Sequence, residues 1–249
     1  MQAYWTLTRR ELAGFFLSIT GYVVIAAVTF LIGFVFDVLI KTLGTDPSPQ
    51  PVTELFYSTY LFWFILLLTT PVITMRLFAL EKFSGTFETL MTTPVSDAQI
   101  LAAKFSAALV FYMVMWLPLL ACLFIVRHYT SDPTAFDPGV VGTTFLGIFL
   151  LGCLFISLGC FASALTRTQM TAAIICLFLS FSLFLLSYLA DKIPSADWKS
   201  QVLSFFGLPD QMHDFVRGVV DTRPVVLYLS LTFFFLFLTL RVLGSRRWK

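Results

Sequence analysis

Long apolar runs separated by short polar segments dominate the chain. Six of these runs reach, or nearly reach, the roughly 20 apolar residues with which a helix crosses a membrane. We expect spans over residues 18–40, 55–75, 105–126, 142–163, 168–190 and 225–243. The last run has only 16 uncharged residues before Arg241, whose long side chain can reach the membrane surface from a helix end. The pattern therefore predicts an all-α membrane protein with one transmembrane domain over residues 1–249.

Two further stretches are amphipathic rather than uniformly apolar. The segment QAYWTLTRRELAGFF, ahead of the first span, gathers aromatic and Leu side chains on one helical surface, so it is expected to lie in the membrane interface. Its interfacial positions are Trp5, Arg9, Arg10 and Glu11. Residues 191–224 contain two short amphipathic pieces broken at Gly207 and Pro209, which are expected to form short helices at the outer face.

The most polar interruption in the first half of the chain is EKFSGTFETLMTTPVSDAQI, between the second and third spans. Its apolar positions recur at the spacing of one helical face, namely Phe83, Phe87, Leu90 and Met91. Pro94 is expected either to end this helix or to bend the chain before a second one. Ser96, with Gln99 three residues later, matches a capping box for a second helix that continues into the third span. The first helix is either an interfacial connector or a docking surface, and its mixture of apolar and charged residues favours a groove in a partner.

Composition and charge agree with a membrane protein and predict its orientation. Only 12% of the residues are charged, against about 25% in a soluble domain, and the net charge of +2 offers no basic block for nucleic acid. With both termini in the cytoplasm, the inner segments carry ten basic and four acidic residues, and the outer segments carry the other six and ten. The positive-inside rule therefore places both termini and residues 76–104 in the cytoplasm.

The sequence also lacks several signatures of catalysis and ion coupling. It has neither a GxxxxGK[ST] phosphate-binding loop nor a GxSxG nucleophile motif, so we expect no enzyme activity of the chain itself. The cores of the second to fifth spans hold no Asp, Glu, Lys, Arg or His, which argues against an ion-coupled pump. Asp37 and Lys41, near the end of the first span, are expected to form an (i, i+4) ion pair.

The remaining candidate ligands favour ordinary roles over a metal site. The four Cys residues fall inside apolar runs without CxxC spacing and are expected to be packing residues; they are Cys122, Cys153, Cys160 and Cys176. His128 and His213 fall in outer segments and are expected to be solvated polar residues.

Features in four places, taken in order, resemble the ABC-2-type permease family. RREL followed by Phe15 and Phe16 is similar to the family's connecting helix. The hairpin between spans two and three resembles its coupling helix through Glu81, Gly85, Thr86, Glu88, Leu90, Pro94 and Lys104. The segment GCFASALTRTQMTAA is similar to the family's turn between spans four and five. The stretches DFVRGVVDTRPVVLYLSL and RVLGSRRW look like the gliding-motility-type subfamily.

The resemblance implies a permease subunit of an ATP-driven ABC transporter in a bacterial cytoplasmic (inner) membrane. The implied partners are two ATP-binding subunits that carry ATP and Mg²⁺, a second permease copy or a paralogue, and an auxiliary subunit with a periplasmic domain. The chain itself is expected to bind no cofactor. The implied contact with the ATPase subunits comprises Glu81, Thr86, Phe87, Glu88, Leu90, Met91 and Pro94.

The resemblance also implies that the second and fifth spans line a pathway at a dimer interface. The candidate lining residues are Thr69, Thr70, Thr74, Thr171, Ser180 and Ser182. Because these spans lack charge, the expected cargo is apolar or amphipathic and is exported. In the second span, Thr hydroxyls are also expected to satisfy the carbonyl that Pro71 leaves without an N–H partner.

Two points stay open at the level of sequence. Small residues in the fourth span, Gly152, Gly159 and Ser163, predict close helix packing, either inside the subunit or between subunits. The same fold could also serve as a structural anchor that transmits ATPase-driven motion to a periplasmic partner, or as a secondary transporter or channel that needs no ATPase.

Overall fold

The computed structural model describes residues 2–45, 52–86, 95–129, 137–190 and 207–245. The regular elements in these ranges are α1 (Gln2–Phe16), α2 (Ile19–Thr45), α3 (Val52–Ser58), α4 (Tyr60–Thr74), α5 (Ala79–Phe83), α7 (Asp97–Met115), α8 (Leu117–Tyr129), α9 (Pro138–Leu165), α10 (Gln169–Ala190), α12 (Leu208–Val216) and α13 (Thr222–Ser245). Six stretches are long and apolar enough to cross a membrane, so the prediction of an all-α protein with six spans is confirmed.

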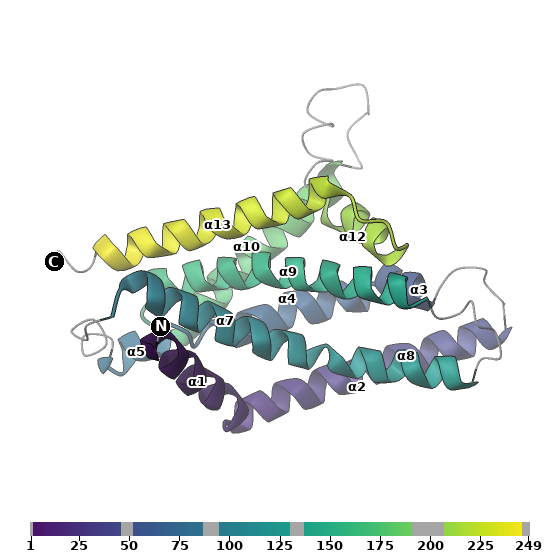
Figure 1. Cartoon of the computed structure of the whole chain (residues 1–249), viewed down its shortest axis with the longest axis horizontal. Helices are drawn as coiled ribbons and strands as arrows, with labels where there is room; N and C mark the ends of the chain where they lie inside the picture. The colour runs from purple at the N-terminus through teal and green to yellow at the C-terminus, as the bar shows by residue number, and fades with distance from the viewer. Residues whose placement is uncertain (1, 46–51, 87–94, 130–136, 191–206, 246–249) are drawn as a thin grey trace.

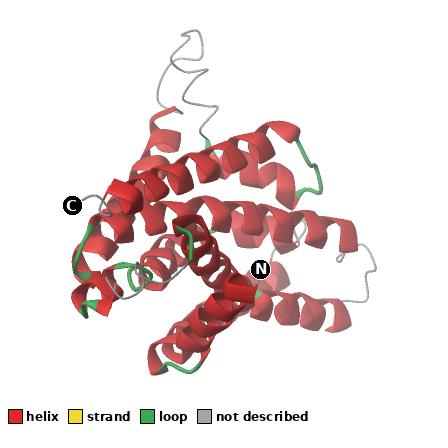
Figure 2. Cartoon of the chain, turned by 60° about the vertical axis from the view of Figure 1, so that its left-hand side comes forward, coloured by secondary structure: helices red, strands yellow, loops and turns green. Residues whose placement is uncertain are grey.

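The fourth span, α9, is the centre of the helix bundle (Figures 1 and 2). It contacts α4, α7, α10, α12 and α13, and 78% of its most apolar stretch is buried. The fifth and sixth spans, α10 and α13, are only 17% and 22% buried over the same length. The outer helices therefore leave large apolar faces open to lipid or to other subunits, whereas α9 is a core helix.

Small residues allow the neighbours of α9 to approach it closely. A Cβ atom at Gly152 would lie 2.4 Å from Cε1 of Tyr112 on α7, and one at Gly159 would lie 2.1 Å from Oγ1 of Thr74 on α4. Neither separation is possible between real atoms, so glycine is required at both positions for this packing. Both glycines therefore pack against other spans of the same subunit.

The second and third spans are each broken into two helices. Thr59 separates α3 from α4 in an extended conformation. In the third span, α7 ends at Met115 with Trp116 as its C-cap, and Pro118 lies in the first turn of α8. Because proline has no N–H and its ring clashes with the preceding turn, a single straight helix is disfavoured there. The helix that begins at Asp97 continues into the third span, as expected from the sequence.

Local capping sets the start of α7 as expected. Ser96 Oγ accepts the backbone N–H of Gln99 at 3.3 Å, and the Gln99 side chain accepts the N–H of Ser96 at 3.3 Å, so the predicted capping box is confirmed. The Asp37–Lys41 pair is confirmed as well, with 2.6 Å between Nζ and Oδ2.

At the opposite end of the bundle from α1 and α5, α3 and α12 lie side by side (Figure 1).

Candidate functional site

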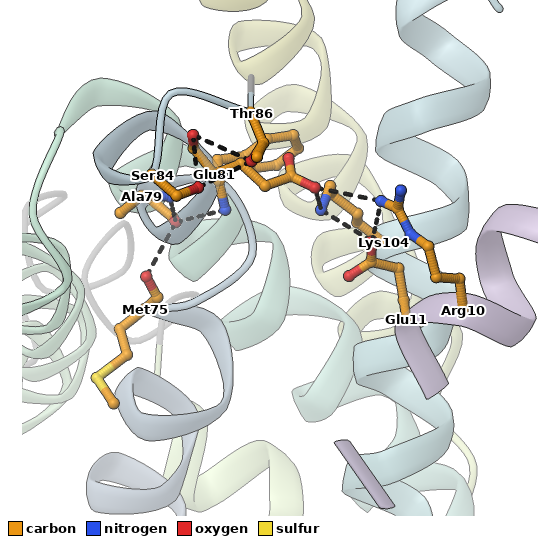
Figure 3. Close-up of polar contacts among 10 residues, drawn as sticks. Arg10, Glu11, Met75, Ala79, Glu81, Ser84, Thr86 and Lys104 are labelled. Atoms are coloured by element: carbon orange, nitrogen blue, oxygen red, sulfur yellow. Dashed lines mark hydrogen bonds and ion pairs between the residues drawn. The ribbon is translucent and has the colours of Figure 1, made fainter. Parts of the chain in front are cut away.

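An ion cluster joins α1, α5 and α7 at one end of the bundle (Figure 3). Lys104 Nζ lies 2.8 Å from Glu81 Oε1 and 3.1 Å from Glu11 Oε1. Arg10 Nη2 lies 2.8 Å from that same Glu11 oxygen and 3.2 Å from that same Glu81 oxygen. Each carboxylate thus bridges both cations, and two positive charges balance two negative ones.

Burial makes Lys104 the critical member of this cluster. Its side chain is 3% exposed, whereas that of Arg10 is 55% exposed. A buried ammonium is costly unless charges and hydrogen bonds compensate for the lost water. Two carboxylates do so here, and the ammonium also lies 5.5 Å from the centre of the Phe78 ring. The hydrogen bond to Glu11 raises the pKa of Arg10 above its ordinary value.

The C-terminal end of α9 fixes the start of α5. Ser163 Oγ accepts the backbone N–H groups of Phe78 at 3.0 Å and Ala79 at 3.1 Å, and it lies 3.4 Å from the carbonyl of Met75. These N–H groups belong to the first turn of a helix, where no earlier carbonyl is available to them. Ser163, expected only as a small packing residue, is therefore also a cap supplied from another span.

Two further contacts hold the same segment. Lys82 donates to the carbonyl of Ala164 at the end of α9. Arg76 donates to Ser18 and Thr20 at the corner between α1 and α2. Residues 76–82 are consequently bonded to four other parts of the chain: α1, the α1–α2 corner, α7 and α9.

Within the described residues 79–86, the helix is shorter than the coupling helix expected from the sequence. The helix predicted to include Phe83 and Phe87 as one face ends at Phe83, because Gly85 takes a left-handed backbone conformation with φ of +74°. Glycine is the usual residue at such a helix end because it has no Cβ. Thr86 follows it, exposed, with its hydroxyl 2.8 Å from that of Ser84. The other candidate contact residues, Phe87, Glu88, Leu90, Met91 and Pro94, lie outside the described residues.

The amphipathic N-terminal helix α1 packs along α7. Phe15 and Phe16 lie 5.0 Å and 5.4 Å from the ring of Phe111, and Tyr4 donates a hydrogen bond of 2.9 Å to Ser106. Of the four interfacial candidates, Arg10 and Glu11 enter the ion cluster. Trp5 is 69% exposed and Arg9 is exposed.

The candidate pathway residues do not share one open surface. Four of them are buried inside the subunit, namely Thr69, Thr70, Thr74 and Ser180. Thr171 is exposed near the start of α10, and Ser182 is half-buried further along it. Their assignment to a pathway at a dimer interface stays a prediction.

The hydroxyls of the second span do not reach the carbonyl that Pro71 leaves free. In a regular helix that carbonyl belongs to Leu67, four residues earlier. The hydroxyls bond instead to carbonyls of other residues: Thr69 to Ile65 at 2.6 Å, Thr70 to Leu66 at 2.7 Å and Thr74 to Thr70 at 2.8 Å. Each returns to its own preceding turn, because that carbonyl is the nearest acceptor for a helical Thr.

A second polar cluster at the opposite end of the bundle was not expected. Glu54 on α3 accepts two hydrogen bonds from Arg217, at 2.8 Å and 3.1 Å, and its Oε1 lies 3.0 Å from His213 Nε2. The bond to Arg217 is the main reason that the pKa of Glu54 lies below its ordinary value. His213, expected to be a solvated residue, is 43% exposed and also contacts this buried carboxylate. The available signal was a single acid, Glu54, at the edge of an apolar run.

Comparison with known proteins agrees with this architecture. A family model described as "ABC-2 family transporter protein" matches residues 22–243. No match was found among curated proteins.

Proposed function

Because the chain belongs to the ABC-2 family of transporter proteins, we propose that it is the permease subunit of an ATP-driven exporter for an apolar or amphipathic cargo. In this proposal, two ATP-binding subunits supply ATP, Mg²⁺ and hydrolysis. They contact the segment that follows α5, at Thr86, Phe87, Glu88, Leu90 and Met91. A second permease copy or a paralogue completes the pore in a bacterial inner membrane, with both termini in the cytoplasm.

The observation that carries this proposal is the ion cluster around Lys104. It bonds α5, which leads directly into the proposed ATPase contact, to α1 and α7. Through Ser163 and Lys82, α5 is also bonded to the central helix α9. A displacement of the segment after Gly85 would therefore act at once on the third and fourth spans. A single exposed loop without such contacts could not transmit that displacement.

Energy coupling then takes the form of a shift between two arrangements of the spans. Nucleotide-bound ATPase subunits would favour the arrangement in which they bind residues 86–91 more tightly. The helices α1, α7 and α9 would move with this segment because α5 is bonded to them. A ligand shifts such an equilibrium only by its difference in affinity for the two states. The contact residues, not the spans, therefore set how strongly ATP drives the change.

We infer that the fifth span faces the second permease copy, because only 17% of its most apolar stretch is buried inside the subunit. Along α10, exposed apolar side chains recur on one helical face, namely Met170, Ile174, Phe178, Phe181 and Leu185. We propose that part of this face contacts the partner permease. Oxidative cross-linking of an Ile174→Cys variant in membranes should then give a dimer. The matched Ile40→Cys variant on the exposed face of α2 should stay monomeric.

The resemblance to the gliding-motility-type subfamily extends the proposal to an auxiliary subunit with a periplasmic domain. It also keeps open a role in which ATPase-driven motion is transmitted to that subunit without solute transport. Transport of a hydrophobic dye in sealed vesicles separates the two roles, because force transmission alone gives no ATP-dependent flux.

The decisive test is purification of the tagged chain from its native membrane in mild detergent. We expect an ABC ATPase to co-purify in equal amount and to be lost from a Phe87→Asp, Leu90→Asp double variant. A Glu88→Lys variant should weaken the association if Glu88 pairs with a basic residue of the ATPase. Recovery of the chain alone, active in vesicles without ATP, would overturn the proposal in favour of a secondary transporter or channel.

A further inference from the structure

An apolar groove of about 600 Å³ lies between α1, α7 and α13, at the end of the bundle that carries α5 and the ion cluster (Figure 1). The helix α7 contacts both of the other helices, and its small, exposed residues Ala98 and Ala102 leave space between them. On α7 the lined stretch from Ala98 to Ser106 is about 12 Å long at 1.5 Å per residue. The groove is therefore large and long enough to hold part of an acyl chain.

The groove offers an occupant almost no polar group. Its two hydroxyls are those of Tyr4 and Ser106, which bond to each other at 2.9 Å, and Ser106 also donates to the carbonyl of Ala102 at 2.7 Å. The other lining side chains are apolar. A polar occupant would lose its water here without gaining hydrogen bonds, which is unfavourable. The groove therefore suits a hydrocarbon chain.

The side of the groove is open to the surroundings of the bundle. Its α13 wall includes Phe233 and Phe237, which are 69% and 52% exposed, and only 22% of the most apolar stretch of this helix is buried. Across the groove lies the amphipathic helix α1, whose Trp5 is 69% exposed. Exposed Trp side chains and amphipathic helices are typical of the boundary between head groups and acyl chains. The groove therefore lies at the depth where a lipid chain meets its head group.

A cation stands at the end of the groove. Arg241 directly follows the lining residue Leu240, is exposed, and forms no ion pair with the residues that the structure describes. Its guanidinium lies 4.9 Å from the centre of the Phe237 ring, one helical turn earlier. Stacking on a ring uses the flat face of a guanidinium and leaves the N–H groups at its edge for a phosphate. Basic residues near a membrane surface attract anionic lipid head groups.

We propose that this groove binds an anionic phospholipid. One acyl chain lies between Ala102 of α7 and Phe237 of α13, and the phosphate accepts hydrogen bonds from the guanidinium of Arg241. A zwitterionic lipid binds more weakly, because its own ammonium group lies near the same arginine. The site requires neither an ATPase subunit nor transport, so it goes beyond the proposed export function and can fail independently of it.

The test uses the full chain in nanodiscs of phosphatidylcholine that contain phosphatidylglycerol with a photoreactive diazirine in its acyl chain. After illumination, mass spectrometry locates the lipid adducts. We expect more adducts on residues 98–106 and 233–240 than around Phe30 and Phe34, which are 72% and 52% exposed on α2. A phosphatidylcholine probe with the same acyl chain should label the groove about fivefold less. Equal labelling by the two probes, or equal labelling of the groove and α2, would show ordinary contact with bulk lipid and overturn the proposal.

Two pairs of variants assign the residues. Arg241→Gln should lower labelling of the groove by phosphatidylglycerol about fivefold, whereas Arg223→Gln, an exposed arginine at the other end of α13, should not change it. Ala102→Phe fills the space on α7 and should abolish the labelling, whereas Ala13→Phe, at an exposed position of α1 outside the groove, should not. Undiminished labelling in Arg241→Gln or in Ala102→Phe would overturn the proposal.

Two other occupants of the groove give different results. A chain that ends at Ser245 should still be labelled, and labelling that occurs only after this truncation would show that residues 246–249 fill the groove. A Phe237→Cys variant should stay monomeric under oxidation in membranes, and a disulfide-linked dimer would show that a second copy of the chain covers the groove. Either result would overturn the proposal.

Discussion

The Lys104 ammonium lies 2.8 Å from the carboxylate of Glu81, and this pair joins the third span to the short helix that follows the second. The two residues are 23 positions apart, on either side of the segment proposed to contact the ATPase. A displacement of α5 would therefore act on α7 through this pair.

Loss of the buried cation should destabilise the protein. In Lys104→Met, Glu11 and Glu81 lose one of their two shared cations. Removing one partner of a buried ion pair typically costs about 3–5 kcal/mol, so a marked fall in melting temperature is expected in detergent. The matched variant Lys41→Met removes a pair whose Lys side chain is 73% exposed and should change stability by less than about 1 kcal/mol. Similar losses in the two variants would contradict this account of Lys104.

Gly159 should be intolerant of even one added methyl group. Gly159→Ala places Cβ 2.1 Å from Thr74 Oγ1, so α4 and α9 must separate. Overpacking of this kind costs about 1–3 kcal/mol. Gly142→Ala in the same helix meets no atom within 4 Å and should instead stabilise the protein by up to about 1 kcal/mol. Melting temperatures that move in opposite directions would bear out the packing, and a neutral Gly159→Ala would refute it.

The Glu54 cluster should make stability depend on pH in the acidic range. Because the folded state holds the pKa of Glu54 below its ordinary value of 4.5, its contribution is present above that value and is lost as pH falls through the folded pKa. Glu54→Gln should cost about 2 kcal/mol at pH 7, since hydrogen bonds to a charged group are lost. The difference in melting temperature between wild type and variant should shrink as pH falls from 5 toward 3. A difference that is constant with pH would contradict the charge-based origin.

The effect of replacing Gly85, in the turn after α5, should depend on how well the new residue tolerates a positive φ. Its φ of +74° costs an alanine about 1–2 kcal/mol but is better tolerated by asparagine. We expect Gly85→Ala to reduce ATP-dependent activity and ATPase co-purification more than Gly85→Asn does. Gly14→Ala, with no atom within 4 Å of the added Cβ, should leave both unchanged. Equal activity and equal ATPase co-purification in the Ala and Asn variants would contradict the role of the positive φ at Gly85.

Much of the architecture could be predicted because it depends on near neighbours in the sequence. The six spans follow from runs of apolar residues, the start of α7 from Ser96 and Gln99, and the Asp37–Lys41 pair from its spacing. The prediction of one helix through Phe83 and Phe87 was wrong because the periodicity of apolar residues did not account for the left-handed turn at Gly85.

The sequence by itself determined that this chain is a six-span helical membrane protein, because each apolar run is long enough to satisfy its own backbone hydrogen bonds in lipid. Only the tertiary structure decided which polar side chains meet. Lys104 finds Glu11 and Glu81, and Glu54 finds Arg217, across helices far apart in the sequence. Helix contacts in a membrane depend on the shapes of the packed surfaces, as in the close approach of Gly159 to Thr74. The periodicity of a single span does not reveal which residues of other spans will meet it.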